Sequence, residues 1–179
     1  MPEREELEAE VVIVGAGVAG LACAIRLAEL LRGMASAPRI LVLEKGARVG
    51  AHVLSGCVLD LRGLDELLPD WRRLDAPVRQ AVTRERLTWL SSRLSFALPG
   101  ALVPRYLRNS GCRVVSLCEL TEWLGEQARR RGVEVLEGVA GAQLLVSGRA
   151  VRGVLCGDTG LDRFRRELVA FKAIGINNY

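Results

Sequence analysis

Residues 11–20 read Val-Val-Ile-Val-Gly-Ala-Gly-Val-Ala-Gly, and this stretch decides the fold. Four apolar, mostly β-branched residues lead into three glycines, after which an apolar helix pattern begins. This order predicts a buried strand, a tight turn and a helix N-terminus. Gly15 permits the sharp turn, Gly17 lets the backbone approach a pyrophosphate, and Gly20 lets the helix pack closely on the strand. The helix dipole favours an anion at this point.

A second strand completes a βαβ unit. We expect a helix over residues 18–31, where Leu21, Ala24 and Ile25 recur at helical spacing, with Gly33 as its end. Residues 40–43, Ile-Leu-Val-Leu, form a continuous apolar run. Such a run is typical of a parallel strand that is covered on both faces.

Glu44 stands at the end of this second strand, 24 positions after Gly20. An acid at this place accepts hydrogen bonds from the diol of a ribose. The combination of glycines, strands and acid therefore predicts a dinucleotide site. Because no arginine follows Glu44 directly, a 2′-phosphate on the ribose is disfavoured.

The rest of the chain alternates between strand and helix patterns. Residues 84–98 alternate as two strands joined at Ser91-Ser92. Such a hairpin lies outside a minimal nucleotide-binding fold, so it predicts part of an antiparallel, substrate-side sheet. The other expected elements are a helical turn at 61–71, a helix from the capping box at 116–119 to Gly132, a strand at 133–136, and a hairpin of 142–146 with 151–156.

The two ends of the sequence follow neither pattern. Residues 3–10 are interpreted as a solvated arm before the first strand. Residues 161–172 are charged and helical in pattern, and we expect nothing in 161–179 to complete the sheet.

Composition argues against several classes of protein. The 179 residues carry a net charge of +4, almost all from arginine, without a basic block that has interleaved aromatic residues. Nucleic-acid binding therefore receives little support. No apolar run is long enough to span a bilayer, and residues 1–10 do not resemble a secretory signal.

The five cysteines are scattered and include no C-x-x-C pair, which predicts reduced, buried thiols in a reducing compartment. Abundant arginine beside only two lysines is typical of a GC-rich bacterial gene. The cysteines are Cys23, Cys57, Cys112, Cys118 and Cys156.

Several stretches resemble electron transfer flavoprotein–ubiquinone oxidoreductase. Beyond the glycine stretch and residues 43–46, the most specific are 50–56, Gly-Ala-His-Val-Leu-Ser-Gly, and 59–71, which contains Leu-Asp-Glu-Leu-Leu-Pro-Asp-Trp. The similarity continues through 109–135 and fades near residue 160. It therefore covers about the first 160 residues, whereas the family is several times longer.

The resemblance implies an α/β, Rossmann-like FAD-binding fold of the glutathione-reductase type, incomplete, with part of an antiparallel substrate-side sheet. An FAD-binding domain would span 1–160, and 161–179 would form an atypical tail. The three glycines would hold the pyrophosphate and Glu44 the adenosine ribose, and the loop around His52, Ser55 and Gly56 would lie near the flavin ring. The candidate cofactor-binding residues are Gly15, Ala16, Gly17, Val18, Ala19, Gly20, Glu44, Lys45, His52, Ser55 and Gly56; none is assigned as catalytic or metal-binding.

The resemblance also implies an oxidoreductase that passes electrons from electron transfer flavoprotein, through FAD and an iron–sulfur cluster, to membrane ubiquinone. The cluster ligands and the ubiquinone-binding region would follow Gly160. We therefore expect no cluster in this chain, and membrane contact only through the missing region. The expected location is the bacterial cytoplasm, or the cytoplasmic face of the inner membrane as part of the full enzyme.

Alternatives remain open. The chain is expected to be too short to be active alone, and it is alternatively a truncated, non-catalytic fragment that at most binds a nucleotide. Another FAD-dependent reductase or monooxygenase would share the same N-terminal fold. For single residues, we interpret His52 as a loop histidine rather than a proton relay. Cys57, Trp71 and Trp123 are interpreted as packing residues.

Overall fold

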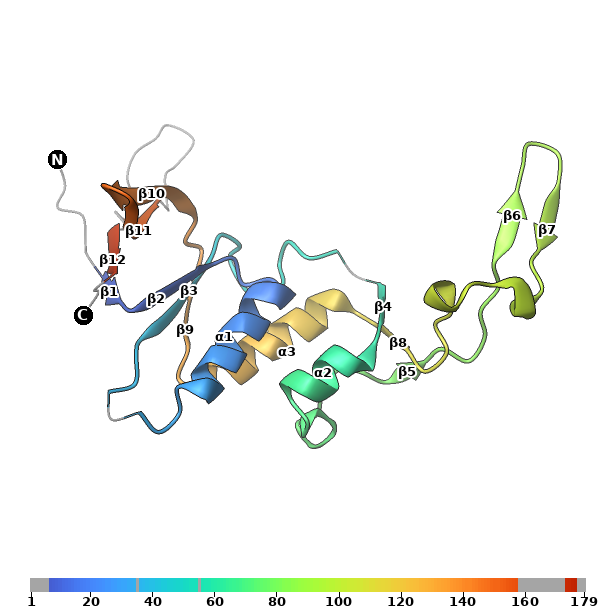
Figure 1. Ribbon diagram of the computed structural model, residues 1–179, viewed down its shortest axis with the longest axis horizontal. Coiled ribbons are helices and arrows are strands. Elements are labelled where there is room, and N and C mark those ends of the chain that lie inside the picture. Colours follow the sequence, from blue (N-terminus) through green and yellow to red (C-terminus); the bar gives the residue numbers. More distant parts are fainter. Residues whose placement is uncertain (1–6, 35, 55, 158–172, 177–179) are drawn as a thin grey trace. The chain divides into compact units, whose positions relative to one another are not determined.

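The computed structural model describes residues 7–34, 36–54, 56–157 and 173–176 (Figure 1). The chain forms two compact units. The first unit combines Met1–Leu54 with Leu117–Tyr179, and the second unit is Ser55–Ser116. The predicted domain boundary near residue 160 falls outside the described residues and stays a prediction.

A three-stranded parallel sheet forms the centre of the first unit. Its order is β2 (Val11–Val14), β3 (Ile40–Glu44) and β9 (Glu134–Glu137). The predicted βαβ unit is confirmed, since α1 (Val18–Leu30) connects β2 to β3. Strand β3 is buried along 40–43, as expected for a central strand covered on both faces.

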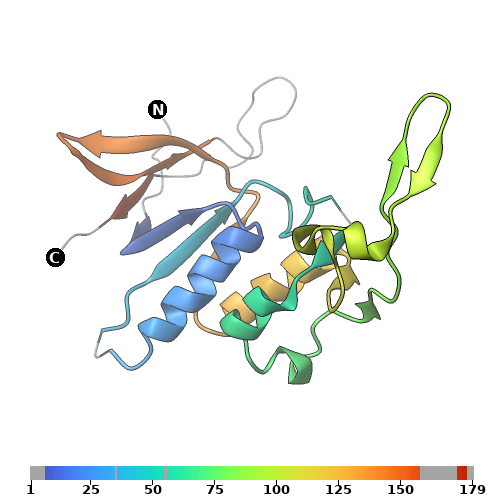
Figure 2. The ribbon, with the colours of Figure 1, turned by 45° about the vertical axis from the view of Figure 1, so that its right-hand side comes forward.

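Two helices cover one face of this sheet (Figure 2). Helix α1 buries Leu21, Ala24 and Ile25, the positions that the sequence spacing predicts. Helix α3 (Leu117–Arg129) buries an apolar stripe that includes Leu120 and Leu124. Beyond the end of α3, Arg131 Nε lies 3.2 Å from Glu29 Oε1 of α1, and this ion pair ties the two helices together.

A second sheet packs on the other face of β3 (Figure 2). Its order is β1-β12-β11-β10. Leu41 and Leu43 of β3 share a buried cluster with Val154 and Cys156 of β11. The layers are therefore the two helices, the parallel sheet and this four-stranded mixed sheet. The strands are β1 (Leu7–Ala9), β10 (Gly141–Ser147), β11 (Ala150–Cys156) and β12 (Ala173–Ile176).

This sheet corrects two expectations about the chain ends. Residues 7–9 of the predicted solvated arm form β1, and Ala9 is only 1% exposed. Residues 173–176 form β12, which pairs in parallel with β1 and antiparallel with β11. The tail thus adds a strand to the second sheet, although it does not join the parallel sheet. The helix pattern at 161–172 lies outside the described residues.

The second unit contains a small antiparallel sheet that the sequence did not indicate. Strand β8 (Arg113–Val115) lies between β4 (Cys57–Leu59) and β5 (Gln80–Ala81). The predicted helical turn is confirmed as α2 (Leu61–Leu67), followed by η1 (Trp71–Arg73). The side chain of Asp60 accepts a hydrogen bond from the Arg62 N–H at the start of α2, and Trp71 is buried, at 5% exposed.

The predicted hairpin at 84–98 is confirmed in a shorter form. Strands β6 (Thr88–Leu90) and β7 (Ser95–Ala97) pair antiparallel, with Trp89 opposite Phe96. Among the described residues they form a two-stranded sheet of their own. Two single turns, η2 (Gly100–Leu102) and η3 (Arg105–Leu107), follow the hairpin.

The cysteines are all free, as predicted, but most are not buried. Cys156 is buried, whereas Cys23 is exposed on α1. The expectation of buried thiols is wrong for Cys23 because the apolar stripe of α1 runs through positions 21, 24 and 25. Trp71 and Trp123 are buried packing residues, as predicted. Within the described part of the chain, no helix has the length and apolar content to cross a membrane.

Candidate functional site

The turn between β2 and α1 has the backbone that its glycines predict. Gly15 has a φ of +100°, a conformation that side-chain-bearing residues rarely adopt, and its N–H donates to the Leu43 carbonyl at 2.7 Å. A Cβ on residue 20 would lie 2.1 Å from the Gly15 carbonyl oxygen. Gly20 is therefore required because helix and turn touch through their backbones.

Gly17 opens the start of α1 toward solvent. It is the N-cap residue, and a Cβ built on it meets no atom within 4 Å. The helix ladder begins with the Leu21 N–H, which donates to the Gly17 carbonyl at 2.9 Å. The N–H groups of Val18, Ala19 and Gly20 precede this bond, and no acidic side chain lies in the first turn. This helix start is suited to an anion.

Glu44 holds the glycine turn and the next loop together. Its Oε2 accepts the Ala16 N–H at 2.9 Å, and its Oε1 accepts the Gly46 N–H at 2.7 Å. A carboxylate has about four lone-pair sites, so each oxygen keeps one for a further donor. Glu44 therefore lies beside the phosphate-suited helix start, oriented by two backbone bonds, and can still accept hydrogen bonds from a hydroxyl group.

The loop after Glu44 is fixed to α3 and β9. The Gly138 N–H donates to the Gly46 carbonyl at 2.7 Å, and the Val49 N–H donates to Glu137 Oε1 at 2.8 Å. Arg129 lies 2.8 Å from the same Glu137 oxygen. The Val49 N–H and Arg129 together hold the pKa of Glu137 below its usual range. The carboxylate thus stays charged and anchors the loop.

A second set of contacts anchors Gly50. The Cys118 thiol donates to the Gly50 carbonyl at 3.3 Å, and Arg48 forms an ion pair with Glu122 of α3. Gly50 has a φ of +82°, and a Cβ there would lie 2.9 Å from the Cys118 carbonyl oxygen. The sequence reasoning assigned no role to Cys118 or Glu122, because a contact over 68 or more positions leaves no local pattern.

The other candidate residues have fewer contacts with the glycine turn and Glu44. Lys45 is exposed, and the exposed His52 turns its Nδ1 toward Gly46, to within 3.3 Å of a Cβ built there. His52 therefore lies beside the loop that Glu44 orients. Ser55 is outside the described residues. Gly56 belongs to the second unit, where it is exposed and has a φ of +88°.

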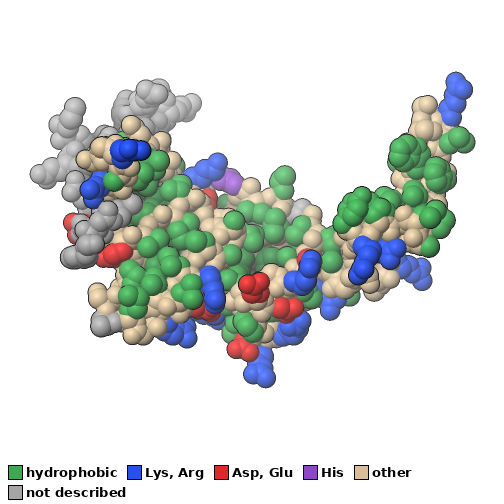
Figure 3. All heavy atoms as spheres, in the orientation of Figure 1, with side chains coloured by type: hydrophobic (Ala, Val, Ile, Leu, Met, Phe, Trp, Pro, Cys, Tyr) green, Lys and Arg blue, Asp and Glu red, His purple; other side chains and the backbone are tan. Residues whose placement is uncertain are grey.

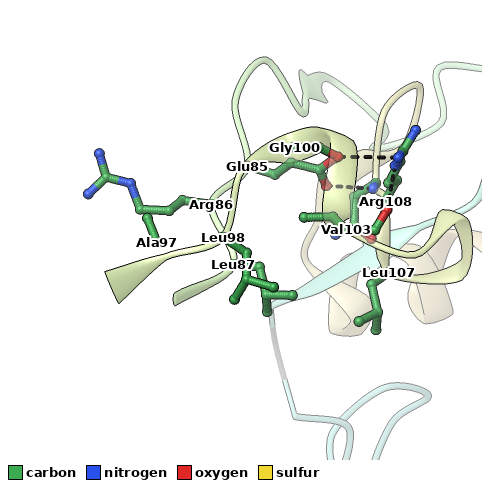
Figure 4. Close-up of a pocket in the computed structure, with 10 residues that line it drawn as sticks. Glu85, Arg86, Leu87, Ala97, Leu98, Gly100, Val103, Leu107 and Arg108 are labelled. Carbon is green, nitrogen blue, oxygen red and sulfur yellow. Dashed lines mark hydrogen bonds between the residues drawn. The ribbon is translucent and has the colours of Figure 1, made fainter. Parts of the chain in front are cut away.

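The second unit has a cavity of about 490 Å³ below its hairpin (Figure 4). Glu85 accepts the Asn109 N–H at 2.6 Å at one wall. Arg108 donates to the Val103 carbonyl at 2.9 Å and to the Gly100 carbonyl at 3.2 Å. These bonds hold the two turns after the hairpin in place, and the sequence reasoning identified none of them.

Comparisons with known proteins agree with this geometry. A family described as NAD(P)-binding Rossmann-like domain matches residues 13–83. The chain is 43% identical over 163 residues to electron transfer flavoprotein–ubiquinone oxidoreductase of Pseudomonas aeruginosa, covering 90% of this chain and 30% of that protein. It is 41% identical over 163 residues to the mitochondrial protein of that name from Bos taurus, covering 90% and 26%. The resemblance inferred from the sequence is confirmed, and the chain spans about 30% or less of these relatives.

Solved structures show the same fold. A geranylgeranyl bacteriochlorophyll reductase-like protein from Thermoplasma acidophilum has a TM-score of 0.65 at 14% identity, covering 96% of this chain and 38% of that one. A myxobacterial chondrochloren halogenase, described as a variant of FAD-dependent halogenases, has a TM-score of 0.53 at 20% identity, covering 83% and 32%. The Rossmann-like α/β fold predicted from the sequence is therefore confirmed.

Proposed function

We propose that this chain, a relative of electron transfer flavoprotein–ubiquinone oxidoreductases over about 90% of its length, binds FAD for an oxidoreductase of that kind. In the longer protein, electrons would pass from electron transfer flavoprotein to ubiquinone. The named relatives support these partners. The observation that carries the cofactor proposal is the position of Glu44, bonded to Ala16 in the glycine turn and to Gly46 in the next loop.

The residues of the first unit fit the adenosine diphosphate part of FAD. The uncapped start of α1 at Gly17 would hold the pyrophosphate, since nothing fills the space around that residue. Glu44 would accept the ribose hydroxyls with its remaining lone pairs. When bound, FAD supplies the redox chemistry, and the protein binds and orients it.

The loop at 46–50 would keep this site in one arrangement. Its bonds to Glu137 and Cys118 fix the backbone beside Glu44 before any cofactor binds. Pre-organisation of this kind lowers the entropy that binding must overcome. His52, whose Nδ1 faces Gly46, would contribute to the wall of the site rather than relay a proton.

A panel of nucleotides tests the proposal. The purified 179-residue chain is titrated with FAD, ADP, FMN and NADH, and binding is followed by calorimetry. We expect FAD and ADP to bind and FMN to fail, because FMN lacks the adenosine half that the glycine turn and Glu44 would hold. Absence of FAD binding, or equal binding of FMN, would contradict the proposal.

The alternatives predict different results in the same experiment. A fragment that only binds nucleotides would bind ADP as tightly as FAD, because no residue of the chain would contact the flavin ring. Robust quinone reduction by the FAD-loaded 179-residue chain would contradict our expectation that it is inactive alone.

A further inference from the structure

The net charge of the chain lies in its second unit. Residues 55–116 contain ten arginines and six acidic residues, so this unit carries the full net charge of +4 and the first unit is formally neutral. Basic side chains are spread over the visible face of the second unit (Figure 3). Three of its arginines, Arg72, Arg79 and Arg113, line one pocket of about 320 Å³. We call these three residues and the space between them the arginine pocket.

Three separate segments build the arginine pocket. Arg72 lies on η1, and Arg113 lies on β8, the central strand of the small antiparallel sheet. Arg79 follows a tight turn in which the Val78 N–H donates to the Ala76 carbonyl at 2.7 Å. Ala76 and Val78 are both 8% exposed, so they hold this turn against the unit. Ordered backbone therefore carries all three arginines.

Arg113 is a cation without an anionic partner. Its side chain is half-buried, and it forms no salt bridge to any residue that the structure describes. Its neighbours across the sheet are Leu59 of β4 and Ala81 of β5, neither of which carries a charge. A guanidinium that is partly removed from water without a counter-charge destabilises the fold. An anion in the pocket would offset this cost.

Arg72 is held in a fixed orientation. Its Nη1 lies 2.7 Å from Asp65 Oδ1, and its Cζ lies 4.2 Å from the centroid of the Trp71 ring. The indole N–H of Trp71 donates to the same Asp65 oxygen at 2.8 Å. A guanidinium has five N–H donors, so the bond to Asp65 leaves others for a ligand. Because Arg72 is already oriented, it would lose little entropy on binding one.

Asp75 is the acidic residue in the wall of the pocket. Its Oδ1 lies 3.6 Å from Arg79 Nη2, and the two side chains are 93% and 81% exposed. Exposed ion pairs of this kind contribute little, so a ligand can take the place of Asp75 beside Arg79. Even when Asp65 and Asp75 are both included, the three arginines leave the pocket positive.

We propose that the arginine pocket binds the phosphate group of a small phosphate monoester. Such a group presents three terminal oxygens and a charge of about −2 at neutral pH. A carboxylate presents only two oxygens and a single charge, and so satisfies fewer guanidinium groups. Arginine also matches the geometry of phosphate oxygens through paired N–H donors. The volume of the pocket suits a small molecule, and the site uses no residue of the proposed FAD site.

Calorimetric titration of the 179-residue chain with glycerol 2-phosphate tests the proposal. We expect saturable binding, with much weaker binding of acetate. R79Q and R113Q should each lower the affinity roughly 10-fold to 100-fold, because each removes charge-assisted hydrogen bonds to the phosphate. R73Q is the matched control, since Arg73 is exposed on the same η1 but does not line the pocket. It should bind the ester as the wild type does.

Two further measurements assign the binding to this pocket. Because the start of α1 also suits an anion, modification by phenylglyoxal is followed at each arginine by mass spectrometry. Glycerol 2-phosphate should protect Arg79 and Arg113 and leave Arg73 reactive. Without the ester, R113Q should unfold at or above the wild-type temperature, since it removes an uncompensated charge. With the ester, the wild type should gain more thermal stability than R113Q.

Several results would overturn the proposal. Absence of saturable binding would do so, as would an equal loss of affinity in R73Q and R113Q. Protection of Arg73 together with the other arginines would indicate a diffuse charge effect instead of a site. A lower unfolding temperature of R113Q with unchanged affinity would show that Arg113 serves packing alone. R79Q keeps the test decisive if R113Q fails to fold, because the Arg79 side chain is 81% exposed.

Discussion

The main-chain N–H of Ala16 donates a hydrogen bond to Oε2 of Glu44 at 2.9 Å, across 28 positions of sequence. Because the other carboxylate oxygen accepts the Gly46 N–H, both sides of Glu44 face backbone donors. The acid at the end of β3 is therefore a part of the glycine turn as well as a candidate ribose ligand. These two roles make Glu44 the most informative position for substitution.

E44Q should weaken both the fold and FAD binding. The amide NH₂ of glutamine has to face either the Ala16 or the Gly46 N–H, so one donor is left opposite another donor. We expect a loss of about 1–3 kcal/mol in the free energy of unfolding. FAD affinity, measured by calorimetry, should fall roughly 10-fold to 100-fold.

A suitable control for E44Q is E126Q. Glu126 lies on α3 with a 61% exposed side chain, and its contact to Arg130 is 3.8 Å long. Exposed pairs of this kind contribute little, so E126Q should match the wild type in stability and FAD affinity. If both variants lose FAD equally, the loss reflects net charge and the role assigned to Glu44 is wrong.

G20A and G17A should separate stability from binding. A methyl group at residue 20 would meet the Gly15 carbonyl oxygen at 2.1 Å, so the backbone has to shift, at a cost of about 1–3 kcal/mol. A methyl group at residue 17 meets nothing and should cost less than about 1 kcal/mol as a helix cap. It would, however, occupy the space through which a phosphate approaches the helix start.

Thermal unfolding and FAD titration of both glycine variants check this contrast. We expect G20A to unfold at a clearly lower temperature and G17A to unfold near the wild type while binding FAD more weakly. G63A on α2, where a Cβ also meets nothing, is the control for glycine replacement in a helix. If G20A were as stable as the wild type, the claim that Gly20 contacts the Gly15 carbonyl too closely for a methyl group would be wrong.

Asp60 should make the stability of α2 depend on pH in the acid range. Hydrogen bonds from the side chain and backbone N–H of Arg62 lower the pKa of Asp60 to about 2. The pKa in the unfolded chain is about 3.9, so the folded state binds fewer protons between these values. The stabilisation is therefore complete above about pH 4 and is lost as the pH falls toward 2.

Denaturant unfolding at several pH values tests this prediction. The difference in unfolding free energy between wild type and D60N should shrink steadily from pH 5 to pH 2. Asparagine caps a helix as well as aspartate does, so D60N isolates the charge. D75N changes an aspartate that is 93% exposed and should follow the wild type throughout. A difference that stays constant with pH would refute the role of the Asp60 charge.

The cysteines should differ strongly in reactivity. Cys23 is exposed on α1, whereas Cys156 is 3% exposed and its burial raises the pKa of the thiol. The thiolate is the reactive form, so a buried thiol with a raised pKa reacts slowly. In the folded protein at pH 8, iodoacetamide should modify Cys23 first and Cys156 last, as followed by mass spectrometry. Equal rates would show that β11 opens readily.

The sequence predicted the βαβ unit because its signals are local. The apolar runs at β2 and β3, the helical spacing from Leu21 to Ile25 and the glycines lie within 34 residues and agree with one another. Strands β1 and β12 were missed because each has only three or four residues, too few for a strand pattern to stand out. Their pairing joins Leu7 to Ile174, and so requires the folded chain to bring the two ends together.

The candidate site was predicted in the same partial way. Gly15, Gly17, Gly20 and Glu44 follow from a motif with fixed spacing, and the structure brings them together. The anchors of the loop at 46–50 do not follow from any local motif, since the Val49 N–H bonds to Glu137 across 88 positions. An acid at the end of a strand looks solvent-exposed in the sequence. Only the folded chain shows that Glu137 holds a backbone N–H.

The anchored loop also has a topological consequence. The chain leaves the first unit after Leu54, shortly after Gly50, and returns at Leu117, directly before Cys118. The thiol of Cys118 donates to the Gly50 carbonyl, so the two crossing points lie beside one contact. Residues 55–116 are thus an insertion within the first unit, closed at its base by that contact. Because the entropy of closing a loop grows slowly with its length, insertions of different size and purpose can be exchanged here at little cost to the unit that carries them.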